Sequence, residues 1–143
     1  MTVPVLGYAG PAPLTVAPLR LARSLRGARA HQGGLAAEEA VEREYLRRGL
    51  DVAARRWRGK AGGEIDLIFR DGPQVVFVEV KAATTLAAAA SRLTRRQMDR
   101  ICLSALEFLD DEPRASLTAM RFDLATVDRQ GQIRILENAF GEA

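Results

Sequence analysis

Two apolar segments near the middle of the chain alternate in a way that predicts paired β-strands. The segments run from Glu64 to Phe69 and from Gln74 to Lys81, and β-branched and aromatic residues dominate both. Residues 70–73 between them read Arg-Asp-Gly-Pro, which is typical of a turn. The two strands are therefore expected to be antiparallel neighbours, with Asp66 beside Glu79.

The rest of the pattern predicts two helices and three further strands. A helix is expected from Leu35 to Arg48, ended by Gly49, and a second helix is capped by Thr94. The alanine-rich stretch 82–90 fits either a loop or a frayed helix. The further strands are expected over 50–56, 121–127 and 132–136. This order predicts an α/β fold with a mixed central sheet of about five strands flanked by helices.

Two faces of the first predicted helix compete for burial. One stripe has leucines at its ends and glutamates in its middle: Leu35, Glu39, Glu42 and Leu46. The other is formed by Ala37, Val41 and Tyr45. The spacing alone leaves both faces open as the one that packs on the sheet.

Three charged residues, Asp66, Glu79 and Lys81, interrupt the two apolar strands. Glu79 and Lys81 are two positions apart, so their side chains leave the same face of a strand. Charges are rare in a core unless they are paired, bind a metal or carry out chemistry. The alternatives are solvent-facing positions on an edge strand, or a buried ion pair in which the lysine neutralises one carboxylate.

These residue types fit a divalent-metal phosphodiesterase. Asp66 and Glu79, with the backbone carbonyl of Val80, are candidate ligands for Mg²⁺ or Mn²⁺, which prefer oxygen donors. The metal would lower the pKa of a bound water and polarise a phosphoryl oxygen. Lys81 would position the hydroxide or offset charge on phosphorus, and a glutamate from the first helix would complete the carboxylate set.

Composition excludes several other kinds of site. The single cysteine, Cys102, excludes an internal disulfide and a thiolate zinc cluster, and the single histidine, His31, argues against a histidine metal site or a Ser-His-Asp triad. The length of 143 residues favours one folded domain. No apolar run approaches the roughly 20 residues needed to span a bilayer. We therefore expect no membrane partner and a cytoplasmic location.

The net charge of +3 hides two groups of basic residues that suit a polyanionic partner. One group precedes the first charged strand and the other opens the second helix, where a helix N-terminus already favours anions. The candidate nucleic-acid-binding residues are Arg55, Arg56, Arg58, Lys60, Arg95, Arg96 and Gln97. The alternative is that both groups are simply solvated. Trp57 either stacks on a base or caps the core.

Residues 1–33 are rich in Pro, Gly, Ala and Arg and contain no acidic residue. We expect a disordered basic N-terminal tail, followed by one domain over residues 34–143. A short basic helix that forms on an acidic surface and an organelle transit peptide are the alternatives for the tail.

The two charged strands resemble the P-D…(D/E)-x-K nuclease superfamily, with Asp66 as the first acid and Glu79-Val80-Lys81 as the second element. More narrowly, the chain resembles the YraN family, small bacterial proteins related to archaeal Holliday-junction resolvases. The likeness covers about Leu35 to Phe140. It is carried by Gly63 to Ile68, Val76 to Lys81, Thr94 with Arg96 and Gln97, and Arg121 to Asp123.

The resemblance implies a restriction-endonuclease-like core with Asp66, Glu79 and Lys81 in the catalytic positions. It also implies that a glutamate of the first helix joins the metal site, and counting back from Tyr45 places it at Glu39, with Glu38 and Glu42 as alternatives. Two departures are present: Glu38 stands where the family usually has glycine, and alanines follow Lys81 where the family commonly has polar residues.

Together these observations predict a Mg²⁺- or Mn²⁺-dependent endonuclease that acts on DNA, branched or damaged DNA included, and recognises backbone and shape. The alternative is a non-catalytic nucleic-acid-binding module in a repair or processing assembly. The resemblance to resolvases allows a homodimer.

Overall fold

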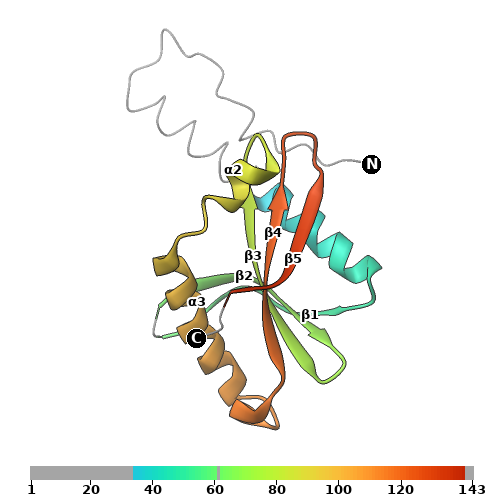
Figure 1. Ribbon diagram of the computed structural model, residues 1–143. Coiled ribbons are helices and arrows are strands. Elements are labelled where there is room, and N and C mark those ends of the chain that lie inside the picture. Colours follow the sequence, from blue (N-terminus) through green and yellow to red (C-terminus); the bar gives the residue numbers. More distant parts are fainter. Residues whose placement is uncertain (1–33, 61, 141–143) are drawn as a thin grey trace, which may run out of the picture.

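The protein is described here by a computed structural model that covers residues 34–60 and 62–140 (Figure 1). The expectations for the tail, residues 1–33, lie outside the described residues. A helix over residues 34–47 is followed by strands β1 to β5, helices α2 and α3, and a 3₁₀ turn, η2. Their bounds are β1 Asp51–Arg58, β2 Glu64–Asp71, β3 Gln74–Ala82, α2 Leu86–Ala90, α3 Arg95–Asp110, η2 Ala115–Leu117, β4 Met120–Val127 and β5 Ile133–Phe140.

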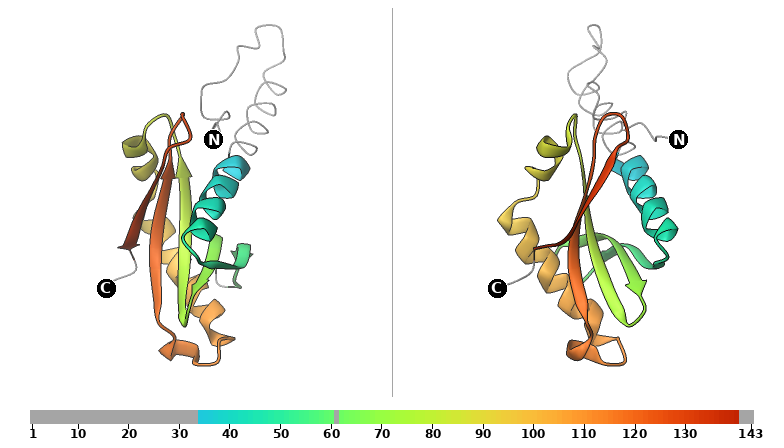
Figure 2. Two further views of the ribbon diagram at one scale, coloured as in Figure 1. Left: turned by 90° about the vertical axis from the view of Figure 1, so that its right-hand side faces the viewer. Right: turned by 45° about the vertical axis from the view of Figure 1, so that its right-hand side comes forward.

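The strands form one mixed sheet in the order β1-β2-β3-β4-β5. Neighbours are antiparallel except β3 and β4, which are parallel and are connected through α2 and α3. Helix 34–47 covers one face of the sheet and α3 the other, as the two views of Figure 2 show. This is the predicted α/β fold, and it is consistent with a restriction-endonuclease-like core.

Each face of the sheet has its own hydrophobic core. Helix 34–47 packs Ala37, Val41 and Tyr45 against the sheet, while α3 packs Ile101, Ala105 and Leu109 on the opposite face. The apolar face of the first helix is therefore the one without glutamates. Gly49, with φ of 95°, follows the helix in the left-handed region that favours glycine.

The second predicted helix begins where its sequence indicates. The Thr94 side chain accepts a hydrogen bond from the Gln97 backbone N–H, and the Gln97 side chain accepts one from the Thr94 N–H. This reciprocal capping box satisfies two of the N–H groups that a helix start leaves free. The alanine-rich stretch after β3 forms the short helix α2, for which Thr85 is the N-cap.

Strand β1 ends two residues beyond the predicted strand, at Arg58, and so takes in Trp57. The Trp57 ring packs edge-on against Phe108 of α3, with 5.4 Å between ring centroids and an interplanar angle of 89°. This contact extends the strand because it buries an aromatic ring under the helix. Of the two expectations for Trp57, the core cap is confirmed.

Asp123 of β4 lies at the centre of a buried polar network. Its carboxylate is fully buried and accepts hydrogen bonds from Tyr45 (2.7 Å), from Arg121 (3.0 and 3.2 Å) and from the Asn138 backbone N–H (3.0 Å). Tyr45 also stacks on Phe69 at 4.4 Å. Burial raises the pKa of the Tyr45 hydroxyl, so it donates as a neutral phenol. The network ties helix 34–47 to the sheet.

No helix among the described residues is long and apolar enough to cross a membrane.

Replacing Tyr45 with Phe should lower the free energy of unfolding by about 1.5–3 kcal/mol, because a buried carboxylate loses a donor while the ring stack is kept. Urea denaturation at pH 7 measures this. Glu44→Gln, on the exposed side of the same helix, is the control and should cost much less, since its ion pairs with Arg47 and Arg48 are at the surface. Equal losses in both variants would contradict the anchoring role of Tyr45.

Candidate metal centre at the fork between two strands

Strands β2 and β3 separate at the position of Asp66. Their backbone pairing ends at Leu67 and Val78, whereas β2 stays paired with β1 as far as Glu64. The N–H of Val80 donates to Oδ2 of Asp66 at 2.8 Å. The Asp66 carboxylate thus satisfies an N–H group that lies beyond the last paired residues of the two strands.

The alternation of β2 also breaks at Asp66. Ile65 and Ile68 both pack in the core under α3, whereas Leu67 packs in the core under helix 34–47. Across the strand pair, the register of β1 places Arg56 opposite Asp66, and Arg56 has φ of 45°. Left-handed backbone at a non-glycine residue is strained and concentrates at functional sites. The fork is therefore a local distortion of the sheet.

Glu79 and Lys81 lie beside Asp66 on β3, as the sequence predicts. Lys81 Nζ is 3.1 Å from Oε2 of Glu79, and both side chains are mostly buried. The other oxygen, Oε1, is buried and has no hydrogen-bond donor among the described residues. Glu79 is 7% exposed, so this oxygen is an acceptor shut off from water and without a donor. Such an atom is costly unless a proton or a cation reaches it.

Burial raises the pKa of both carboxyl groups at the fork. The pKa of Glu79 rises to about 8, chiefly by desolvation and then by the charge of Asp66, against the opposing charge of Lys81. Desolvation also raises the pKa of Asp66. The two groups are close enough to share a hydrogen bond when one is protonated. A single ammonium does not balance two buried carboxylates, so the pair favours an additional positive charge.

The donor set fits a hard divalent cation that keeps part of its water shell. Asp66 and Glu79 supply carboxylate oxygens, the ligands that Mg²⁺ prefers. No three Asp, Glu, Cys or His side chains of residues 34–60 and 62–140 gather closely enough to hold a metal ion. A cation here would complete its coordination with backbone oxygen, water or substrate.

The helix glutamate whose pKa is affected by Asp66 is Glu38, one of the two alternatives, and the metal-site role expected for Glu39 stays a prediction. Glu39 is exposed. Desolvation followed by the charge of Asp66 raises the pKa of Glu38 to about 7, and Glu38 also pairs with Arg56 at 3.4 Å. Because each helical residue turns the side chain by about 100°, a shift of one position moves the carboxylate to another face. Glu42, the other alternative, instead pairs with Arg55.

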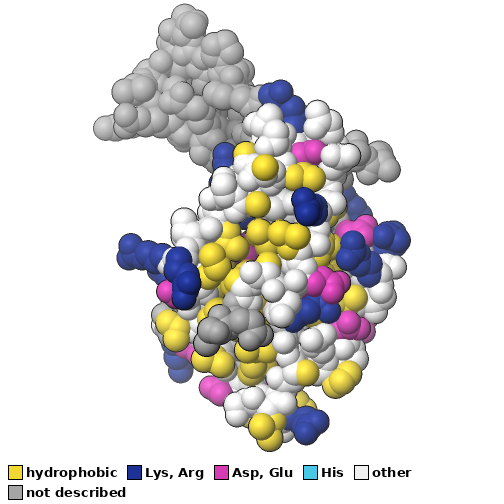
Figure 3. Space-filling view, in the orientation of Figure 1, with side chains coloured by type: hydrophobic (Ala, Val, Ile, Leu, Met, Phe, Trp, Pro, Cys, Tyr) yellow, Lys and Arg dark blue, Asp and Glu magenta, His cyan; other side chains and the backbone are white. Residues whose placement is uncertain are grey.

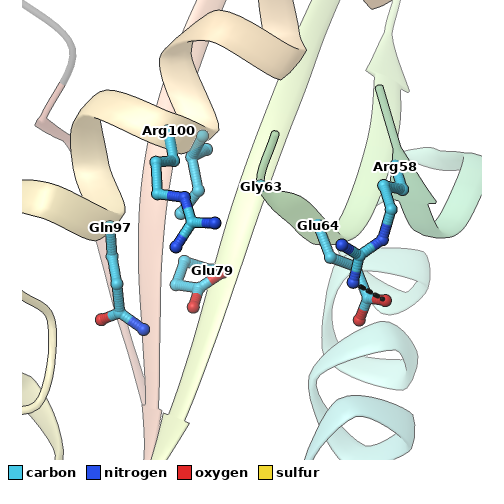
Figure 4. A pocket seen from close by; sticks show the side chains of 7 residues that line it. Arg58, Gly63, Glu64, Glu79, Gln97 and Arg100 are labelled. Atoms are coloured by element: carbon cyan, nitrogen blue, oxygen red, sulfur yellow. Dashed lines mark ion pairs between the residues drawn. The ribbon is translucent and has the colours of Figure 1, made fainter. Parts of the chain in front are cut away.

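Two predicted nucleic-acid-binding residues, Arg58 and Gln97, line a pocket of about 230 Å³ beside Glu79 (Figure 4). The pocket also contains Arg100 of α3, which sequence reasoning did not single out as a site residue. The signal that pointed there was the arginine cluster at the start of α3. Of the arginines in that cluster, Arg100 lines the pocket.

The remaining predicted basic residues are divided between ion pairs and solvent. Arg55 pairs with Glu42 at 2.7 Å, and Arg95 with Asp99 at 3.4 Å. Lys60 and Arg96 are exposed, and the Lys60 backbone N–H donates to Glu107. On the face shown in Figure 3, the Lys and Arg side chains are scattered among acidic and apolar ones and form no continuous basic patch.

The mixed sheet and the carboxylate–lysine group at its fork place the chain among α/β proteins with a restriction-endonuclease-like core. The model of Uncharacterised protein family UPF0102 matches residues 37–127. The chain belongs to this family, which is the YraN family, as the resemblance predicted.

Relatives in this family align with the chain over nearly their whole length. A UPF0102 protein of Cereibacter sphaeroides strain KD131 is 59% identical over 116 residues, which is 81% of this chain and 98% of the relative. One from Ruegeria pomeroyi is 55% identical over 81% of this chain and 94% of the relative. One from Roseobacter denitrificans is 46% identical over 90% of this chain and 99% of the relative.

The metal-free protein should lose stability as the pH rises from about 4.5 to 8. A carboxyl whose folded pKa lies above its unfolded pKa stabilises the fold at low pH, and this contribution is lost as the pH passes the folded value. Glu79, with a pKa of about 8, and Glu38, with a pKa of about 7, both have this sign. Urea titrations in chelator should therefore show a shallower pH dependence for Glu79→Gln than for the wild type. Identical slopes would contradict the burial of an uncompensated carboxyl at position 79.

Proposed function

We propose that this protein is a divalent-metal-dependent endonuclease that hydrolyses phosphodiester bonds in DNA. The observation that carries the proposal is the buried Oε1 of Glu79, which has no hydrogen-bond donor in the described part of the chain and belongs to a side chain beside Asp66 and the Lys81 ammonium. Two carboxylates that need a cation, with a lysine at contact distance, are the groups that metal-assisted phosphodiester hydrolysis requires.

In this proposal Asp66 and Glu79 hold Mg²⁺ or Mn²⁺, with the Val80 carbonyl as a further ligand. When bound, the metal lowers the pKa of a coordinated water and polarises a phosphoryl oxygen. The hydrogen bond from the Val80 N–H fixes the orientation of the Asp66 carboxylate before substrate arrives.

Lys81 and Glu38 have separate roles. The Lys81 ammonium is held against Glu79 and is placed to stabilise negative charge that develops on the phosphoryl oxygens. Glu38, with a pKa of about 7 and near Asp66, is suited to accept a proton from the attacking water at neutral pH. Arg56, which pairs with Glu38, keeps that carboxylate oriented toward the fork.

The proposed substrate is DNA recognised through its backbone and shape. Arg58, Arg100 and Gln97 surround the pocket next to Glu79, and they are donors suited to phosphate oxygens. Branched or damaged DNA is the proposed target because the family resembles junction resolvases. Cleavage of two strands would then require a homodimer. A DNA substrate also fits a cytoplasmic location, which is part of this proposal.

A non-catalytic nucleic-acid-binding module is the second candidate function. It is favoured by one observation: within the part of the chain that the structure describes, no third acidic group joins Asp66 and Glu79 closely enough to complete a metal cluster. This candidate predicts salt-sensitive DNA binding without cleavage in any divalent metal.

Purified protein should cut branched, flapped or single-stranded DNA in Mn²⁺ or Mg²⁺ and not in chelator. Asp66→Asn should abolish cutting because it removes a ligand charge while keeping the acceptor for Val80. Lys81→Met should reduce the single-turnover rate by about 10²–10³-fold, the usual effect of losing one electrostatic contact to the transition state. Asp71→Asn, an exposed position on the same strand, is the matched control. Cleavage that survives Asp66→Asn would come from another site or a contaminant.

The two neighbouring helix glutamates provide a paired test. Glu38→Gln should lower the cleavage rate and remove the kinetic step near pH 7, since Glu38 faces Asp66. Glu39→Gln should match the wild type, because that side chain is exposed. Both changes replace one carboxyl group with an amide in the same helix turn, so a difference between them reports the surroundings of the two positions. The measurement is the single-turnover rate from pH 5.5 to 8.5, and a lower rate in Glu39→Gln with normal Glu38→Gln would contradict this geometry.

A further inference from the structure

The pocket beside Glu79 is built from three segments that are distant in sequence. Arg58 comes from the end of β1, Gly63 and Glu64 from the entry to β2, and Gln97 and Arg100 from α3. Figure 4 shows Glu79 near Gln97 and Arg100, with Arg58 and Glu64 together on the other side of Gly63. The buried Oε1 of Glu79, which has no donor among the described residues, belongs to the residue that lines this pocket.

Close packing fixes the α3 wall of the pocket. Ser104 Oγ, fully buried, donates to the carbonyl of Gly63 at 2.6 Å. A Cβ added at Gly63 would lie 3.1 Å from Arg100 Cβ and 3.2 Å from its carbonyl carbon. Only a glycine lets the helix approach this closely without displacement. The backbone of Arg100 is therefore held directly against the entry to β2.

Three side chains of the pocket, Arg58, Gln97 and Arg100, offer donors to a ligand that enters from solvent, beside the carboxyl groups of Glu64 and Glu79. Gln97 Oε1 accepts from the Thr94 N–H at 3.2 Å, so its amide nitrogen is left as a donor, and Figure 4 shows that nitrogen on the side of Glu79. Arg58 and Arg100 add two guanidinium groups, which match the tetrahedral oxygens of phosphate.

The charges of the pocket explain why a phosphate would bind only together with a cation. Two acidic side chains, Glu64 and Glu79, line the pocket together with Arg58 and Arg100, and Glu79 also pairs with Lys81. Glu64 holds Arg58 at 3.7 Å, but both side chains are more than a third exposed, so the pair is weak and can exchange for a phosphate. A divalent cation bound to Glu79 would remove the repulsion between this carboxyl group and the phosphate.

We propose that this pocket binds a phosphate group of the nucleic-acid backbone between Arg58 and Arg100, next to the phosphate at the metal centre, and that a divalent cation at Asp66 and Glu79 is needed for it to bind. The inference rests on the proposed function for the cation and goes beyond it by assigning a second phosphate site and Arg100 as the residue that holds it. Ser104 and Gly63 are positioning residues for that arginine.

The test is fluorescence anisotropy with a labelled DNA duplex in Ca²⁺, which also takes oxygen ligands, with gels of the same samples confirming that the DNA is intact. Arg100→Gln should weaken binding about tenfold, the effect expected for one charge-assisted contact. It should also lower the slope of log affinity against log salt by about 0.9, the value for one lost phosphate contact. Arg114→Gln, beyond the far end of α3, removes the same charge and should change neither quantity. Arg100 is exposed, so the variant should melt like the wild type.

The outcomes separate this inference from the nuclease proposal. Loss of affinity and of salt slope in Arg100→Gln, in Ca²⁺ and not in chelator, supports the pocket whether or not DNA is cut in Mn²⁺. Unchanged binding in Arg100→Gln and in Arg58→Gln overturns the pocket, even if the wild type cuts DNA. Equal weakening by Arg114→Gln also overturns it, because the effect would then be one of total charge.

Discussion

A buried backbone N–H group must have an acceptor, and the hydrogen bond from Val80 to Asp66 meets this requirement where two strands part. If β2 and β3 stayed paired beyond Leu67 and Val78, the backbone of β2 would occupy the space that the carboxylates use. If they parted without Asp66, the Val80 N–H would lose its acceptor. One side chain therefore opens the sheet and places a carboxylate at the opening. The burial of Glu79 and its ion pair with Lys81 follow from the same separation.

Side chains from helices on both faces of the sheet lie near the fork. A short hydrogen bond fixes each of these helices to the sheet. On one face, the Tyr45 hydroxyl bonded to buried Asp123 fixes helix 34–47, two turns along from Glu38. On the other face, Ser104 bonded to the Gly63 carbonyl fixes α3 beside Arg100. Both hydrogen bonds are short. They fix the position of each helix more strictly than apolar packing alone, because apolar surfaces can slide past each other. The geometry of the fork thus depends on two helices that pack on opposite faces of the sheet.

The sequence was sufficient for the strand residues of the site and insufficient for the helical ones, for a geometric reason. Asp66, Glu79 and Lys81 lie in two strands joined by a short turn, so their alternation and the turn determine that they meet. Glu38 and Glu39 are neighbours on a helix, and only the packing of Tyr45 and Val41 decides which of them faces the fork. The apolar pattern of that helix contained this information, since the face without glutamates is the buried one.

Among the pocket residues, Arg58 and Gln97 were predicted from the sequence, whereas the role of Arg100 was not, because it depends on contacts between distant segments. Arg100 was one of several arginines, and nothing local distinguishes it from Arg95 or Arg96. Its place is set by the approach of α3 to Gly63, about forty residues earlier, where the absence of a Cβ permits contact. In the same way, the ion pair between Arg55 and Glu42 joins β1 to helix 34–47 and neutralises part of a group that looked like a free basic surface.

If a divalent cation and DNA bind as we propose, the electrostatics of the fork couple the two binding events positively. Without a cation, Asp66 and Glu79 share one ammonium and burial raises the pKa of both carboxyl groups, and the adjoining pocket is lined by two acidic and two basic side chains. Such a surface has no reason to attract a polyanion. A divalent cation at Asp66 and Glu79 reverses the local sign, so it favours phosphate in the pocket. Because coupling between two ligands is reciprocal, bound phosphate must raise cation affinity by the same factor. A site that is weak for each ligand alone thus becomes specific for both together.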